Sequence, residues 1–358
     1  MSPLRFSGPV LPDGEVRELF VVDGVVTYEK PLGAETAGEG WIVPGLVDAH
    51  NHLGLEDGGG EMEPAAIEAQ AIADRDNGVL LTRDCGSPSD TRWVQDREDL
   101  PRLIRCGRHI ARTKRYLRNY GLEIEPGELA DTVAAEAAGA DGWVKLVGDW
   151  ISREKADLTP SFPEDAVAEA IATAHRHGAK VTAHCFGTDS VGPLLDAGID
   201  CIEHGVGLSE HHLQQMVDND VALVPTVLQT NKMLGIADAG REKYPTYART
   251  MEGLHARRRD VLMAAYEAGI ALYVGSDDGT SARHGVLHEE IEAMADMGLP
   301  ASYVLAAASW RARAWLGWNS GLGEGDPADF VVYPRSPVED LSVLRSPTRV
   351  VLRGRVVA

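Results

Sequence analysis

Two histidines separated by a single residue close an apolar run near the start of the chain. The stretch VPGLVDAHNHL, residues 43–53, places His50 and His52 two positions apart. In a β-strand, such residues point to the same face and lie about 6 to 7 Å apart along the strand. Two neutral imidazoles at this separation can bind one metal ion, although two polar residues at the exposed end of a strand would give the same pattern.

Further residues of the metal-binding type recur at the ends of short apolar runs. The runs DGWVKLVGDW, AKVTAHC, IDCIEH and IALYVGSD carry Lys145, His184, His204 and Asp277. Imidazole and carboxylate suit zinc, manganese, iron or nickel. Lys145 differs, because an ammonium binds no metal and only a carbamate formed with carbon dioxide would make it a ligand. One such histidine could be a structural residue, but six such residues at five strand ends indicate a metal-dependent active site.

The segments between these residues predict an α/β fold that would bring them together. Short apolar runs alternate with amphipathic stretches such as PEDAVAEAIATAHRHG, close to eight times between residues 45 and 318. This alternation favours a (β/α)8 barrel over residues 45–318, in which the carboxyl ends of the strands form the site. Both chain ends instead show the pattern of short antiparallel strands. We therefore expect residues 1–44 and 319–358 to form one small β-sandwich domain.

Composition excludes several other classes of function. The 358 residues include 55 acidic and 34 basic ones, and the net charge of -21 argues against binding nucleic acid or an anionic membrane. We find no secretion signal and no apolar run of about 18 residues, so we expect a cytoplasmic protein that acts on a small molecule. The four cysteines are scattered and are expected to be reduced. The segment ASWRARAWLGW leaves open whether the chain forms a homo-oligomer.

With these motifs in view, the sequence resembles the amidohydrolase superfamily of metal-dependent hydrolases. The resemblance runs nearly end to end, through PGLVDAHNH, Lys145, VTAHCFG, EHGVG and GSDDGT into the tail GLGEGDPADFVVYPRSPVEDL. The order of the EHG, VPT, GSD and HE motifs is similar to that of the subgroup containing imidazolonepropionase and the lysine-bearing Xaa-Pro dipeptidases and carboxypeptidases. A barrel with a β-sandwich domain is the fold that this resemblance implies.

The resemblance also implies a set of ligands. A first divalent metal would be held by His50, His52 and Asp277. A second would be held by His184 and His204 and bridged to the first by Lys145 as a carbamate. Members without the lysine bind a single metal, so we expect one or two ions per chain, with zinc as the favoured metal. A metal-activated hydroxide would attack the substrate, and Asp277 would shuttle its proton to the leaving nitrogen.

A basic segment and one departure from the family bear on the substrate. In CGRHIARTKRYLRNYG, Arg115 could bind a substrate carboxylate, although a basic helix face paired with acidic neighbours is an equal alternative. His109 is placed similarly to a histidine that dipeptidase-like relatives use near the substrate. Where those relatives tend to carry a carboxylate-binding tyrosine, this chain has Gln229 in VPTVLQTNKML. Gln229 is thus a candidate substrate contact, and its presence argues against dipeptidase activity.

These observations predict an enzyme that cleaves a C–N bond in an amide, peptide-like or cyclic amide substrate. The alternative is a single-metal deaminase of a heterocyclic or amino substrate. Deaminases of the superfamily usually place a glutamate shortly after the fifth-strand histidine, whereas Cys185, Phe186 and Gly187 follow His184 here. A non-enzymatic scaffold relative would be expected to have lost ligands, and none is missing.

Overall fold

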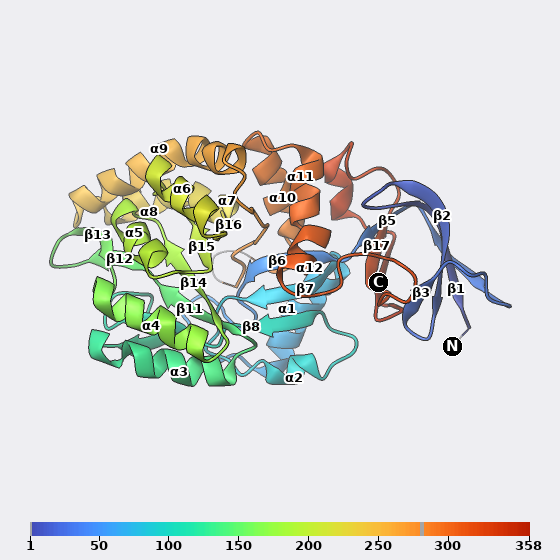
Figure 1. Cartoon of the computed structure of the whole chain (residues 1–358), viewed down its shortest axis with the longest axis horizontal. Coiled ribbons are helices and arrows are strands. Elements are labelled where there is room, and N and C mark those ends of the chain that lie inside the picture. The colour runs from blue at the N-terminus through green and yellow to red at the C-terminus, as the bar shows by residue number, and fades with distance from the viewer. Residues whose placement is uncertain (1, 280–282) are drawn as a thin grey trace.

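A computed structural model describes residues 2–279 and 283–358 of the chain, with a sheet built from both chain ends beside a body of parallel strands and helices (Figure 1). The end sheet has eight strands in the order β19-β18-β17-β5-β1-β2-β3, with β4 paired to β1. Its strands are β1 (Leu4–Val10), β2 (Glu15–Val22), β3 (Val25–Thr27), β4 (Glu35–Glu39), β5 (Trp41–Pro44), β17 (Phe330–Tyr333), β18 (Arg349–Leu352) and β19 (Arg355–Val356).

The two chain ends join where β17 pairs with β5. This pairing is antiparallel, with Val331 opposite Val43. Phe6 and Phe330 pack edge to face in the core of the sheet, with ring centroids 4.9 Å apart. The alternating pattern of the terminal segments therefore produces antiparallel strands, as the sequence predicts.

Parallel strands make up the centre of the chain. They form a three-stranded sheet, β6-β7-β8, and a six-stranded sheet, β10-β9-β11-β14-β15-β16. The bounds are β6 (Leu46–Asn51), β7 (Val79–Asp84), β8 (Arg102–Arg105), β9 (His109–Arg112), β10 (Gly121–Ile124), β11 (Trp143–Val147), β14 (Lys180–Cys185), β15 (Cys201–His204) and β16 (Ala222–Val224). Every residue of β6, β7 and β11 is buried, as expected for parallel strands covered on both faces.

Helices follow these strands and cover them, as Figure 1 shows on the left of the molecule. The α-helices are α1 (Pro64–Asp76), α2 (Arg92–Gln95), α3 (Leu129–Gly139), α4 (Glu164–Arg176), α5 (Thr188–Asp196), α6 (Glu210–Asp218), α7 (Val227–Asn231), α8 (Met233–Gly240), α9 (Pro245–Glu267), α10 (Leu287–Asp296), α11 (Ala301–Ala307) and α12 (Trp310–Trp315). Two 3-10 helices, η1 (Pro126–Glu128) and η2 (Leu341–Arg345), complete the helical elements of the described residues.

A short segment after α9 connects the two parallel sheets. Leu272 forms a parallel bridge with Leu223 in β16, and the Ala49 amide of β6 donates to the carbonyl of Val274 over 2.9 Å. Residues 271–275 thus lie between β16 and β6 and bring the two sheets together. The mixed α/β class predicted from the sequence is confirmed by this arrangement of parallel strands and covering helices.

One feature departs from the simple strand-helix alternation. The run DGWVKLVGDW is not a single strand, because β11 ends at Val147 and a separate hairpin begins at Asp149. The hairpin pairs β12 (Asp149–Ser152) with β13 (Asp157–Pro160) in antiparallel fashion. It extends beyond the carboxyl end of β11 and carries Trp150. Across the described residues, we find no helix with both the length and the apolar character needed to cross a bilayer.

Candidate metal centre

Three of the predicted ligands converge at the carboxyl end of β6. The Nε2 atoms of His50 and His52 lie 3.1 Å apart, and Asp277 Oδ1 lies 3.2 Å from the first and 3.0 Å from the second. All three side chains are buried. Three donor atoms facing one another at such distances are typical of a chelating site, because each carries a lone pair directed at a common point.

Backbone contacts hold these donors in place. His52 Nδ1 donates to the Gly86 carbonyl over 2.9 Å, which leaves Nε2 free to offer its lone pair. The Asp277 amide donates to the His50 carbonyl over 2.8 Å, and Asp277 has a φ of 56°. Burial alone would raise the pKa of Asp277, but His50 and His52 hold this pKa well below its usual value. The carboxylate is therefore ionised and able to bind a cation.

Two further predicted ligands form a neighbouring pair. His184 Nδ1, at the end of β14, lies 2.8 Å from His204 Nε2, at the end of β15. His204 Nδ1 is hydrogen-bonded to Thr226 Oγ1 over 2.6 Å. His204 and Thr226 both have left-handed backbone conformations, with φ of 64° and 43°, which are costly for residues other than glycine and cluster at functional sites. Burial lowers the pKa of His204 to about 3 and that of His184 well below its usual value, so both imidazoles are neutral.

Lys145 makes a contact that no local sequence pattern indicates. Its ammonium forms an ion pair with Glu203, the glutamate of the EHG motif, and both side chains are fully buried. Burial would lower the pKa of Lys145, but the charge of Glu203 raises it. Because a carbamate forms on a neutral amine, carboxylation of Lys145 has to replace this ion pair.

Glu203 has other partners that would remain after such a change. Thr182 Oγ1 donates to Glu203 Oε1 over 2.7 Å, and Arg83 Nη2 lies 3.6 Å from the same oxygen. Arg83 is completely buried, and its guanidinium packs against the rings of Trp143 and Trp315, at 4.5 and 5.0 Å from their centroids. The glutamate thus keeps a cationic neighbour whether or not Lys145 is charged.

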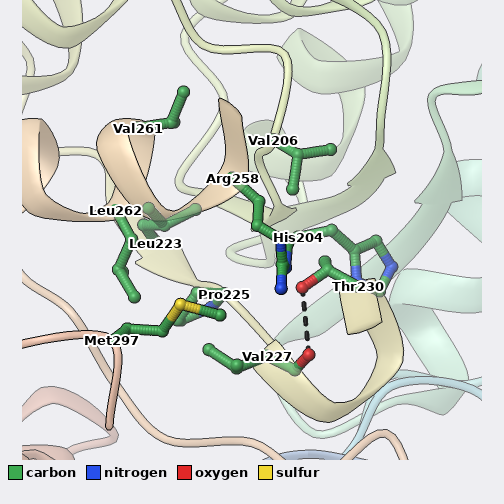
Figure 2. A pocket seen from close by; sticks show the side chains of 10 residues that line it. All are labelled: His204, Val206, Leu223, Pro225, Val227, Thr230, Arg258, Val261, Leu262 and Met297. Atoms are coloured by element: carbon green, nitrogen blue, oxygen red, sulfur yellow. Dashed lines mark hydrogen bonds between the residues drawn. The ribbon is translucent and has the colours of Figure 1, made fainter. Parts of the chain in front are cut away.

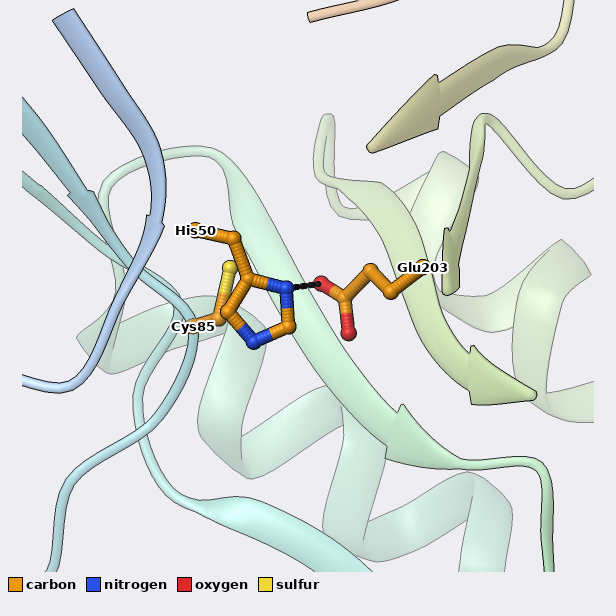
Figure 3. Close-up of side chains that lie close together, drawn as sticks. All are labelled: His50, Cys85 and Glu203. Carbon is orange, nitrogen blue, oxygen red and sulfur yellow. Dashed lines mark ion pairs between the residues drawn. The ribbon is translucent and has the colours of Figure 1, made fainter. Parts of the chain in front are cut away.

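Glu203 also lies beneath the first group of ligands. Figure 3 shows His50 with its second nitrogen turned toward Glu203, 3.7 Å from Oε1, and with Cys85 beside it. These three side chains also bring possible ligand atoms within 4.8 Å of one another. Burial raises the pKa of the Cys85 thiol, which keeps it protonated, and the oxygens of Glu203 are already engaged by Lys145 and Thr182. We therefore infer that Cys85 and Glu203 hold His50 in place and do not bind a metal ion themselves.

The predicted ligands open onto a cavity of about 300 Å³. Gln229, in α7, lines it as well, and its buried Oε1 has no hydrogen-bond partner among the described residues. The cavity wall includes residues that were not singled out from the sequence as substrate contacts. They are Leu55, Asp57, Tyr116, Leu117, Tyr120, Trp150, Phe186 and Ile236. Tyr247, a partial substitute for the carboxylate-binding tyrosine of the relatives, lines the cavity too.

The other two candidate substrate contacts lie elsewhere. His109 begins β9, is buried, and stacks on the ring of His52 at 4.8 Å, so it supports His52 from behind and does not line the cavity. Arg115 Nη2 donates to the carbonyls of Trp150 and Thr159 over 2.7 and 2.9 Å. Arg115 therefore braces the β12–β13 hairpin, and its geometry fits a structural role better than carboxylate recognition.

A second, much smaller cavity touches His204 from another side (Figure 2). Its volume is about 10 Å³, and its lining is mainly apolar, including Val206, Leu223 and Met297. The Thr230 hydroxyl at its edge is already bound to the Val227 carbonyl over 3.0 Å. This space holds at most a water molecule and is a packing gap behind the histidine.

Comparison with known proteins places the chain in a family. An uncharacterized protein of Mycobacterium tuberculosis (strain ATCC 25618 / H37Rv) is 47% identical over 354 residues, which cover 98% of this chain and 95% of that protein. An adenine deaminase of Bradyrhizobium sp. (strain BTAi1 / ATCC BAA-1182) is 27% identical over 217 residues, which cover 54% of this chain and 32% of that protein. The crystal structure of a Xaa-Pro dipeptidase with bound methionine superposes with a TM-score of 0.85 at 19% identity, covering 99% of each chain.

The match to a family extends over most of the sequence. Residues 41–357 match the amidohydrolase family, a span that includes all six candidate metal ligands. The resemblance seen in the sequence motifs is thereby confirmed. The chain belongs to the amidohydrolase family and is an enzyme that acts on carbon–nitrogen bonds.

Proposed function

We propose that this protein is a metal-dependent amidohydrolase that cleaves the C–N bond of an amide, peptide-like or cyclic amide substrate. The observation that carries the proposal is the convergence of His50 Nε2, His52 Nε2 and Asp277 Oδ1 within 3.2 Å of one another at one end of the cavity. Two imidazoles and an ionised carboxylate are a donor set that fits a divalent cation.

The chemistry divides between the ion and the protein. His50, His52 and Asp277 would hold a divalent ion, and its Lewis acidity would lower the pKa of a water and polarise the scissile carbonyl. Asp277 lines the cavity and accepts the proton of the attacking water, which its carboxylate then delivers to the leaving nitrogen. Gln229 offers an amide that can bind the substrate.

The full set of ligands is also part of the proposal. His184 and His204 would hold a second ion, with Lys145 as a bridging carbamate, and zinc is the metal we propose. The pairing of Glu203 with Arg83 supports this, because Glu203 would keep a cationic neighbour after Lys145 lost its positive charge. We further propose that residues 45–318 close into a (β/α)8 barrel and that residues 1–44 and 319–358 form the accompanying β-sandwich domain.

The experiment that tests the proposed function is removal and return of metal. Purified protein is stripped with a chelator and assayed against N-acyl amino acids, dipeptides, cyclic amides and heterocyclic amines, before and after addition of zinc. We expect hydrolysis only after zinc is restored, and no hydrolysis with Asp277→Asn. Release of ammonia from a heterocyclic amine with no amide cleavage would instead identify the deaminase alternative, and equal rates in stripped and loaded protein would contradict metal dependence.

A further inference from the structure

Aromatic side chains surround the predicted second-ion ligand on the cavity side. We call Tyr116, Trp150, Phe186 and Tyr247 the aromatic wall, since all four line the cavity. Tyr116 packs against Trp150 with ring centroids 4.8 Å apart, and Trp150 and Phe186 flank His184 at 5.4 and 4.5 Å. A substrate whose scissile bond reaches His184 therefore lies close to aromatic rings.

The charges along the same cavity are unsuited to an anionic substrate. Apart from the imidazoles, the charged side chains that line it are Asp57, Lys145 and Asp277. Asp57 is exposed and negative, and the ammonium of Lys145 is paired with Glu203. Among the residues that the structure describes, no other cation lines the cavity.

Besides the proposed metal ions, which the scissile carbonyl would occupy, a carboxylate bound beside the aromatic wall would thus lose water without gaining a cation from any described side chain, which is costly. Gln229 offers an uncharged alternative. Its Oε1 is buried without a partner among the described residues, so it can accept a hydrogen bond from a substrate N–H. An amide group in the substrate can satisfy this atom and also accept from Gln229 Nε2, whereas a carboxylate can bind Nε2 only and leaves Oε1 without a donor.

Cationic side chains cluster in a surface hollow outside the cavity. A surface hollow of about 660 Å³ is lined by Arg108, Lys114, Arg118 and Arg153. It shares Tyr116 with the cavity, so the two spaces adjoin at this residue. Cations of the basic segment therefore gather outside the cavity rather than beside the aromatic wall.

From these observations we infer that the substrate is an uncharged amide with an aromatic group next to the scissile C–N bond, and that a free carboxylate at that position is disfavoured. This inference rests on the proposed function, and it names the class of substrate for the same site. It assigns Tyr116 and Trp150 to holding the aromatic group and Gln229 to binding a neutral amide.

A matched pair of substrates tests the inference. N-acetyl-L-phenylalaninamide and N-acetyl-L-phenylalanine differ only in whether the carboxyl group is a neutral amide or a carboxylate. With zinc-loaded protein, we expect kcat/KM for deacetylation to be at least roughly tenfold higher for the amide. N-acetylglycinamide, which lacks the ring, is expected to react at least roughly tenfold more slowly than the phenylalanine amide.

Variants separate the roles of individual residues. Gln229→Arg adds a cation to the cavity and is expected to shift the preference toward the carboxylate, whereas Gln229→Met, of similar size, lowers the rate without creating that preference. Tyr116→Leu is expected to lower the advantage of the aromatic substrate, and Tyr116→Phe to retain it. Arg118→Ala, in the surface hollow, serves as the control and should leave the ratio unchanged. Thermal unfolding confirms that each variant is folded.

The outcomes distinguish this inference from the proposed function. Faster cleavage of the carboxylate, or a loss of its cleavage in Arg118→Ala, would overturn the inference while leaving a metal-dependent amidohydrolase intact. Binding provides a second readout, because calorimetry with metal-free protein should detect the neutral amide at lower concentration than the carboxylate. Equal binding of both would overturn the inference even if neither is turned over, whereas a lack of amide cleavage across the wider panel would contradict the proposed function itself.

Discussion

Replacing Glu203 with glutamine removes the anion on which two buried cations depend. Glu203 is completely buried, pairs with Lys145, and lies 3.6 Å from Arg83 Nη2. In Glu203→Gln both cations stay buried with one anion fewer, and loss of one member of a buried charge pair costs about 3 to 5 kcal/mol. We therefore expect this variant to be strongly destabilised in the metal-free state.

The expected shift in melting temperature follows from the length of the chain. An unfolding entropy of about 2.1 cal/mol/K per residue gives about 0.75 kcal/mol/K for 358 residues. A loss of 3 to 5 kcal/mol then lowers Tm by about 4 to 7 °C. Differential scanning calorimetry of chelator-treated protein measures this shift.

Two comparisons identify Lys145 as the source of the effect. In Lys145→Met/Glu203→Gln both members of the pair are neutral, so the double variant should be more stable than the sum of the two single changes predicts, by at least about 1 kcal/mol. If metal and bicarbonate convert Lys145 to a carbamate, Glu203→Gln should also cost less in the loaded protein. A Tm within about 1 °C of wild type for metal-free Glu203→Gln, or strict additivity in the double variant, would refute the reasoning.

Three further predictions concern catalysis, pH and the hairpin. Asp277→Asn should fold normally and lower kcat by at least about 100-fold, because an amide cannot shuttle the proton, and steady-state rates check this. Burial raises the pKa of Asp84 to about 7, so its contribution to stability is complete below about pH 4 and is lost as the pH rises through 7. Between pH 4 and 8, the free energy of unfolding of metal-free wild type should therefore fall by up to about 4 kcal/mol relative to that of Asp84→Asn. Urea unfolding measures both free energies, and the same pH dependence in the two proteins would contradict this prediction. Arg115→Ala should lower the free energy of unfolding by about 1 to 3 kcal/mol, because carbonyls of the hairpin are left unpaired, and it should leave KM unchanged. A KM raised only for carboxylate substrates would instead show that Arg115 binds the substrate carboxylate.

The sequence predicts the parts of the site that depend on local spacing. His50 and His52 converge because residues two apart share a face of a strand, and the parallel arrangement of β6, β14 and β15 brings His184 and His204 to the same end of the strands. The strand-and-helix alternation likewise predicts the α/β class. These features follow from the two-residue period of side chains in a strand and from the alternation of strands and helices, and both patterns are visible in a single sequence.

Contacts between residues that lie far apart in the sequence cannot be predicted from local patterns. The EHG motif contains Glu203, but nothing local indicates that its carboxylate reaches Lys145 in β11 and Arg83 in β7. Arg115 and Tyr116 are neighbours in a basic segment, yet the first binds hairpin carbonyls and the second lines the cavity. Their opposite roles arise from the loop between β9 and β10, whose path is set by tertiary packing and not by residue type.

The measurement that tests the central claim most directly is the metal content of protein grown with bicarbonate and zinc, in wild type and in Lys145→Ala. We predict close to two ions per chain in wild type and one or none in the variant, because in the proposed site a carbamate on Lys145 would be a ligand of both ions. About one ion in both proteins would contradict the bridged site and make Lys145 a structural partner of Glu203. Protein that binds no metal in either form would contradict the proposed function altogether.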